Sequence, residues 1–254
     1  DEETRQDLRI DVSRGLVEPM SVLLWALLGL LVGGVLNHLA DRLPKHQSVR
    51  GVPVCVHCGS ARQRRQWVSA LALVTGGARC RSCGKALPLR NWLLECGVAL
   101  LYGYLAWRYG TSWKTALAAL HASVLALVTV TDLETRIVPD AAVLPAAALT
   151  VVATFVTCAR CVPMMLLGGV GAFLLFAILA LIRPGAMGMG DVKLAGYVGL
   201  IAGYPRVVFS LVIAIVAGGV GAAVLLASGR ADRRSYMPYA PYLALGGVLA
   251  VLFG

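Results

Sequence analysis

Charged residues are scarce in this sequence. Only 14% of its 254 residues are Asp, Glu, Lys or Arg, whereas 58% are hydrophobic. A soluble domain of ordinary composition carries about 25% charged residues, so the composition argues against that class. A basic segment of the kind that opens a cleavable signal peptide is also missing, because residues 1–19 hold six acidic residues against three basic ones.

Long apolar runs take the place of the missing charge. A helix of roughly 20 apolar residues crosses the hydrocarbon core of a bilayer, and a chain surrounded by lipid satisfies its backbone groups by forming helices. We therefore expect an all-α, polytopic helical membrane protein with about eight transmembrane helices and a small cytoplasmic loop domain. The expected spans lie near residues 20–40, 92–108, 114–131, 141–157, 162–182, 192–204, 206–228 and 240–253.

The basic residues are concentrated in one loop. Between Arg42 and Arg90 there are ten Lys or Arg residues and no acidic residue. The positive-inside rule then predicts that the 41–91 loop is cytoplasmic and that the N-terminus lies outside. Counting spans forward places three further loops in the cytoplasm: 132–140, 183–191 and 229–239, the last of which contains Arg230, Arg233 and Arg234.

This charge does not indicate nucleic-acid binding. The basic residues flank membrane segments, and neither an aromatic stacking platform nor a recognition-helix pattern accompanies them. Membrane topology and contact with anionic membrane lipid explain the charge. We expect no nucleic-acid partner.

Four cysteines in the basic loop form two Cys-x-x-Cys pairs. Cys55 and Cys58 make the first pair and Cys80 and Cys83 the second, and each pair is followed by a glycine. Glycine permits the tight turn that points two thiolates at one ion. This spacing is typical of a tetrahedral structural zinc site, and a redox dithiol is the main alternative. Bound Zn²⁺ would fold a loop that is too polar to build its own core.

The other three cysteines predict less. Cys158 and Cys161 fall in an expected extracytoplasmic turn, where either a local disulfide or two free thiols fit the spacing. Cys96 lies inside an expected span, and there we expect it to pack against neighbouring side chains.

Two aspartates lie where apolar spans meet polar loops. Asp132 follows the expected span 114–131, and Asp191 precedes the expected span 192–204. A carboxylate at the edge of hydrocarbon is costly and by default marks a functional site, although each could instead cap a helix end. Two carboxylates within a few ångströms share a proton, so that one can accept a proton from water while the other donates to a scissile carbonyl.

The residues around the two acids fit that chemistry. Gly188 and Gly190 would let the backbone approach an extended substrate. Pro139 and Asp140 restart a span after the polar loop, and Lys193 could pair with the site or extend to the membrane surface.

A different class of function uses the same groups. A proton-coupled transporter or a non-enzymatic membrane scaffold would employ the two acids for proton coupling or packing. Transporters place such acids near the middle of the membrane, whereas these lie at expected span ends. His121, inside the span 114–131, fits a buried packing residue better than a proton relay.

Six sequence blocks, in order, resemble the bifunctional type IV prepilin peptidases, which are leader peptidases and N-methyltransferases among the membrane aspartic proteases with a Gly-x-Gly-Asp motif. The resemblance covers almost the whole chain. Its blocks are Asn37 with Arg42 and Pro44, the four cysteines, Arg90 to Glu95, Asp132 with Val138-Pro139-Asp140, Gly188-x-Gly190-Asp191-x-Lys193, and Met237 to Gly246.

The resemblance implies that Asp132 and Asp191 are the catalytic acids. It also implies cytoplasmic cleavage of the short basic leader of prepilins or pseudopilins in a bacterial inner membrane, followed by N-methylation from S-adenosylmethionine. Residues 1–91 would then form a methyltransferase-associated region and residues 92–254 the peptidase domain. Asn37 and Arg42 are candidates for the methyl-donor site, with helix packing as the other explanation.

Overall fold

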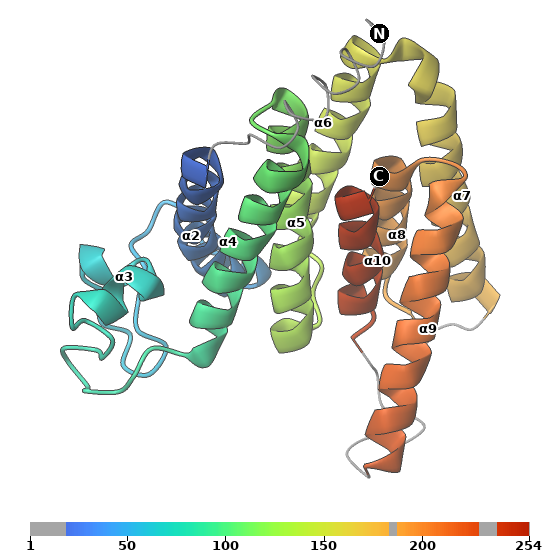
Figure 1. Ribbon diagram of the computed structural model, residues 1–254. Helices are drawn as coiled ribbons and strands as arrows, with labels where there is room; N and C mark the ends of the chain where they lie inside the picture. Colours follow the sequence, from blue (N-terminus) through green and yellow to red (C-terminus); the bar gives the residue numbers. More distant parts are fainter. Residues whose placement is uncertain (1–18, 183–186, 229–237, 254) are drawn as a thin grey trace, which may run out of the picture. The chain divides into compact units, whose positions relative to one another are not determined.

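The computed structural model describes residues 19–182, 187–228 and 238–253, and its regular secondary structure there is helical (Figure 1). The predicted fold class is confirmed. The acidic segment 1–18, the arginines Arg230, Arg233 and Arg234, and Met237 lie outside the described residues. The α-helices are α2 (Pro19–Arg42), α3 (Ser69–Val74), α4 (Leu89–Tyr109), α5 (Trp113–Thr135), α6 (Asp140–Thr157), α7 (Val162–Ile182), α8 (Met189–Ala202), α9 (Arg206–Ala227) and α10 (Ala240–Phe253), with short 3₁₀ turns η1 (Leu43–Lys45), η2 (Arg64–Gln66) and η3 (Ala159–Cys161).

Every predicted span coincides with a helix, and five of these helices are long and apolar enough to cross a membrane. The five segments are Pro19–Lys45, Trp113–Thr135, Asp140–Thr157, Ala159–Ile182 and Arg206–Val224. Helix α4 has 21 residues but includes charged side chains, and α8 and α10 have 14 residues each. Fourteen residues extend about 21 Å, which is less than the hydrocarbon thickness. A crossing by these three helices stays a prediction.

The chain divides into two compact units. The first contains residues 1–38 and 50–123, and the second contains residues 39–49 and 124–254. The chain passes between the units within α2, in the loop after η1 and within α5. The functional boundary predicted at residue 91 concerns activity, and it stays a prediction.

Helix α8 is the centre of the second unit. It contacts α6, α7, α9 and α10, and Figure 1 shows it between α7 and α10. Glycines permit the close approach of α7, because a Cβ on Gly168 would lie 2.7 Å from the carbonyl oxygen of Gly199. Small residues at such crossings are typical of helix packing in lipid. Around them, Phe176, Leu194 and Tyr197 are almost fully buried.

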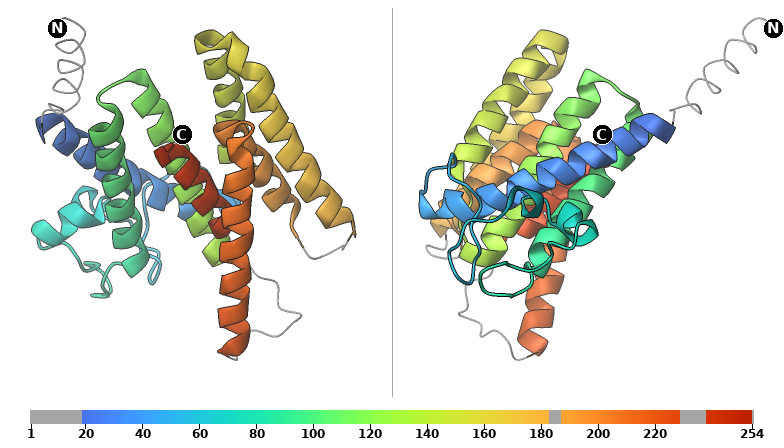
Figure 2. Two further views of the ribbon diagram at one scale, coloured as in Figure 1. Left: turned by 45° about the vertical axis from the view of Figure 1, so that its right-hand side comes forward. Right: turned by 90° about the vertical axis from the view of Figure 1, so that its left-hand side faces the viewer.

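Glycines also permit a close helix crossing in the first unit, between α2 and α4. A Cβ on Gly29 would lie 2.7 Å from the Cα of Ala99, and one on Gly33 would lie 2.6 Å from the Cα of Glu95. Figure 2 shows α2 crossing α4, with α3 beside them. The two helices can therefore meet backbone to backbone only because these positions carry no side chain.

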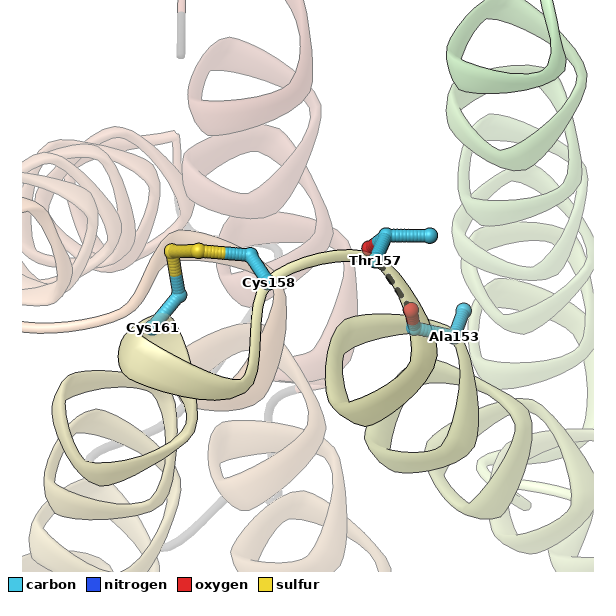
Figure 3. The surroundings of a disulfide bond; sticks show 4 residues. All are labelled: Ala153, Thr157, Cys158 and Cys161. Atoms are coloured by element: carbon cyan, nitrogen blue, oxygen red, sulfur yellow. Dashed lines mark hydrogen bonds between the residues drawn. A yellow bond between two sulfur atoms is a disulfide. The ribbon is translucent and has the colours of Figure 1, made fainter.

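The turn between α6 and α7 contains a disulfide. Cys158 and Cys161 are joined, with 5.3 Å between their Cα atoms (Figure 3), which decides between the two states that the sequence left open. Beside it, the Thr157 hydroxyl donates a 2.7 Å hydrogen bond to the Ala153 carbonyl. The packing expected for Cys96 is wrong, because its side chain lies on the exposed face of α4.

Candidate active site and metal site

Asp132 lies in the last turn of α5, where the helix leaves its apolar environment. Its side chain is buried, with 2% of the residue exposed. The carboxylate oxygen Oδ2 accepts a 3.2 Å hydrogen bond from the backbone N–H of Ala240, the first residue of α10. The orientation of the Asp132 carboxylate is therefore set by a backbone group 108 residues further along the chain.

Asp191 lies in the first turn of α8, after the N-cap residue Gly188. Acidic side chains are favoured there because the helix dipole and the unpaired N–H groups face them. The residue is 3% exposed, so this helix start lies inside the second unit. Both predicted acids are therefore buried at helix ends that face polar loops.

One cavity of about 240 Å³ is lined by both aspartates. A cavity of this size has room for several water molecules. Its remaining walls come from the loop that follows α5, from the start of α6 and from the start of α8. The lining residues are Asp132, Arg136, Ile137, Val138, Asp140, Gly188, Gly190, Asp191 and Lys193.

The residues predicted to support the acids form contacts in or next to the walls of this cavity. A Cβ on Gly190 would lie 2.8 Å from the Cβ of Val138, so in this structure Gly190 allows α8 to pack on the loop after α5. Pro139 is the N-cap residue of α6. The Lys193 ammonium forms a 2.6 Å ion pair with Asp140 at the cavity wall. Lys193 therefore pairs within the site, one of the two roles that the sequence left open.

Tyr239 is a site residue that sequence reasoning did not single out. It precedes Ala240, and its ring contacts that of Phe176 at a centroid distance of 6.0 Å. Burial raises the pKa of the Tyr239 phenol, and the nearby charge of Asp191 raises this pKa further. The segment 239–240 thus bonds to Asp132 through Ala240 and lies within electrostatic range of Asp191 through Tyr239. Tyr239 lies in the Met237 to Gly246 block that the sequence comparison had marked, but the sequence did not indicate that this block lies near the acids.

The four predicted cysteine ligands come together in the first unit. Their sulfur atoms all lie within 4.8 Å of one another, with 3.8 Å between Cys55 and Cys83 and 3.7 Å between Cys58 and Cys80. Zinc–sulfur bonds of about 2.3 Å in a tetrahedron require sulfur–sulfur distances of about 3.8 Å. The cluster could therefore hold a metal ion.

The two knuckles have the same backbone geometry. Gly59 and Gly84 both adopt a φ of 70°, a conformation that favours glycine, as the sequence predicted. The N–H of each glycine bonds to the carbonyl of the first cysteine in its knuckle, Cys55 or Cys80. The repeated turn explains why each pair of thiols points inward.

Ser60 is a second residue that the sequence did not reveal. Its hydroxyl lies 3.0 Å from the sulfur of Cys58 and 3.5 Å from that of Cys80. Hydrogen bonding from Ser60 lowers the pKa of the Cys58 thiol, and with the backbone N–H groups of Cys83 and Ser82 it lowers the pKa of Cys80 to about 5. The site thus favours thiolates, the form that binds metal.

Cys83 behaves in the opposite way. The Lys85 N–H lowers the pKa of this thiol, but desolvation and the other three thiols together raise it to about 11. Four thiolates therefore repel one another in the absence of a cation, and a divalent ion would remove that repulsion.

Asn37 and Glu95 form a buried polar contact between α2 and α4. The Asn37 side-chain amide donates to the Asn91 carbonyl at 3.1 Å and to Glu95 Oε1 at 3.3 Å. The carboxylate of Glu95 also accepts the backbone N–H groups of Ser69 and Ala70, each at 2.8 Å, so it caps α3. Asn37 thus takes part in helix packing.

Arg42, the other candidate for the methyl-donor site, lies in the second unit. Its guanidinium donates a 2.6 Å hydrogen bond to the Ser48 carbonyl and so closes the turn after α2. The contact is local and structural.

Comparison with known proteins agrees with the two-part organisation. Residues 119–223 match the type IV leader peptidase family, and residues 27–109 match the bacterial Peptidase A24 N-terminal domain. No solved structure matches the chain.

Similar proteins from three bacteria are each named prepilin leader peptidase/N-methyltransferase. The protein from Pseudomonas aeruginosa is 30% identical over 92% of this chain and 90% of its own length. The one from Pseudomonas putida is 30% identical over 92% and 91%, and the one from Bacillus subtilis is 27% identical over 89% and 92%. With its apolar helices and its two buried acids, this chain belongs to the type IV leader peptidase family.

Proposed function

We propose that this protein is a membrane aspartic endopeptidase that cleaves the leader of prepilins or pseudopilins, with Asp132 and Asp191 as its catalytic pair. The observation that carries the proposal is that the two carboxylates, 59 residues apart in sequence (191 − 132), are both buried and line one cavity. Three relatives that match most of the chain are named for this peptidase activity.

The proposed chemistry needs a water molecule and one shared proton. The ionised member of the pair accepts a proton from water, whose oxygen attacks the scissile carbonyl carbon. The protonated member donates to the carbonyl oxygen. When the tetrahedral intermediate collapses, the first acid passes the proton it took from water to the leaving amine nitrogen, and the second regains its proton from the hydroxyl group, so the leader and the new N-terminus are released and both acids return to their starting states. No covalent enzyme intermediate forms. The Ala240 N–H keeps the Asp132 carboxylate oriented through this cycle.

The membrane setting orients the substrate. In the bacterial inner membrane, the 41–91 loop and both acids would face the cytoplasm, because the loop between Arg42 and Arg90 is basic and without acids. A prepilin whose apolar helix lies in the bilayer would then present the residues just before that helix to the cavity.

Two further parts of the proposal concern the first unit. The ion held by Cys55, Cys58, Cys80 and Cys83 is Zn²⁺ with a structural role, since four thiolates leave no open position for catalysis. A second activity, N-methylation of the new N-terminus from S-adenosylmethionine, follows from the relatives' names. Transfer of labelled methyl groups from S-adenosylmethionine to the N-terminus of a cleaved pilin tests this activity separately.

The decisive experiment is cleavage of a prepilin with a basic leader by the purified full-length protein in lipid. We expect Asp132→Asn and Asp191→Asn each to lower the rate by about 10²–10⁴-fold, since each removes one proton-transfer group. Both variants should still bind substrate, because an amide has the shape of the carboxylic acid.

Glu134→Gln is the matched control. It makes the same chemical change at a carboxylate two residues after Asp132 in α5, but this one is exposed and is not among the residues that line the cavity. It should retain most of the activity. Undiminished cleavage by either Asp132→Asn or Asp191→Asn would exclude the catalytic pair.

A further inference from the structure

We infer that α3, inside the four-cysteine loop, is an interfacial helix whose apolar face is inserted into the bilayer. Three of its six residues, Leu71, Leu73 and Val74, are exposed large hydrophobic side chains, with exposed fractions of 51%, 61% and 86%. Trp67, two residues before the helix, is 42% exposed. Adjacent apolar side chains on one short helix mark a surface that is covered by another apolar phase.

The level at which α3 packs on the spanning helix α2 indicates that this apolar phase is the bilayer. The carbonyl of Trp67 and the side chain of Val68 pack on Gly34, at 2.9 and 3.0 Å from the position of a Cβ there. Gly34 lies eight residues before Arg42, the end of α2, which is about 12 Å along the helix. The apolar part of a spanning helix is already in hydrocarbon at that distance.

Helix α4 meets α3 at the same level, because its Glu95 packs on Gly33 of α2. Glu95, which caps α3 through the N–H groups of Ser69 and Ala70, is six residues beyond the start of α4 at Leu89. Six residues correspond to about 9 Å. The start of α3 is therefore held by two helices at a level well inside their ends, and its exposed side chains face outward from there.

The polar end of this segment suits a lipid headgroup. Arg64 and Arg65 in η2 are exposed and lie three and two residues before Trp67. Gln66, between them and Trp67, is buried and donates to the carbonyls of Gly77 and Arg79 at 2.9 and 2.8 Å, which closes the hairpin that carries α3. An indole and two guanidinium groups beside an apolar helix are the side chains found at the membrane surface.

Photo-cross-linking of the full-length protein in nanodiscs of equal phosphatidylcholine and phosphatidylglycerol tests this inference. One protein carries p-benzoylphenylalanine at Val74, and the matched control carries it at Val56, an exposed valine within the first knuckle. We expect lipid adducts by mass spectrometry from position 74 and few from position 56. Phosphatidylglycerol adducts should predominate by at least about fivefold, since each arginine near the membrane surface favours anionic lipid by about that factor.

Further variants separate the two parts of the inference. In the Val74-labelled protein, Leu73→Asp should greatly reduce lipid adducts, and the double change Arg64→Gln with Arg65→Gln should remove the preference for phosphatidylglycerol. Metal content measured in each variant shows that the loop is still folded. Equal labelling at positions 56 and 74, or no lipid adduct at position 74, would overturn the insertion of α3. Equal labelling of the two lipids in the parent would overturn the headgroup contact.

Discussion

The four-cysteine loop of the first unit and the helices of the second unit are stabilised in different ways. The four-cysteine region of the first unit has few buried apolar side chains, and its parts are joined by thiols, by Gln66 and by the carboxylate of Glu95. The second unit is held by close helix crossings and a continuous apolar core around α8. Polar contacts and a metal site can order a loop that has no core, whereas positioning two buried acids requires rigid helices.

The largest expected effect follows from removing the thiols. Cys55→Ser with Cys80→Ser takes one ligand from each knuckle, so the loop loses the binding energy that folds it. We expect loss of bound metal and rapid proteolysis within residues 51–88, with leader cleavage retained at a reduced rate.

Metal analysis and limited proteolysis of the purified protein measure this. Cys96→Ser is the control, because that cysteine is exposed on α4 and outside the cluster. Full protection of the loop in the double variant would show that the four thiols do not stabilise this loop.

The second prediction concerns the crossing of α7 and α8. A Cβ on Gly199 would clash with the backbone of Gly168, and neither backbone can move without separating the helices. Gly199→Val should therefore destabilise the second unit by about 3 kcal/mol, and cleavage should fall with it. In contrast, Gly171→Ala on α7 meets nothing within 4 Å and should change stability by less than about 1 kcal/mol. Thermal unfolding in detergent compares the two.

The third prediction tests the cap on α3. Glu95→Gln keeps the size of the side chain but replaces one acceptor oxygen by a donor, so one of the N–H groups of Ser69 and Ala70 loses its partner. We expect a cost of about 1–3 kcal/mol, detected as faster hydrogen exchange at residues 69–74. Exchange in α8 should stay unchanged, and a loss of protection there would mean that the cap serves both units.

The smallest expected effect is a shift in the pH dependence of metal binding. Protons compete with metal for thiolates, so acidification releases the ion. Ser60→Ala removes the hydrogen bonds that lower the pKa of Cys58 and Cys80, so both thiols hold protons more tightly. The midpoint of metal loss should move to higher pH by about one unit or less. Ser82→Ala, which keeps its backbone N–H, should leave the midpoint in place.

Local patterns predicted much of this molecule. Apolar runs of span length predicted where the helices lie, and the Cys-x-x-Cys-Gly repeats predicted a shared turn, which Gly59 and Gly84 adopt. Such features depend on neighbours within a few residues. The outward side chain of Cys96 was not predictable in this way, because the tertiary packing of α2 on Glu95 and Ala99 decides which face of α4 is buried.

The sequence by itself determined the helical membrane class, the family, the two candidate acids and the four candidate ligands, because hydrophobic length and motif spacing are written along the chain. Only the tertiary structure decided that Ala240 fixes Asp132, that Ser60 serves the thiols, and that Glu95 caps α3. The physical reason is that each of these contacts joins separate elements of the fold or lies outside any recognisable motif. Only the folding of the whole chain brings such groups within hydrogen-bond distance.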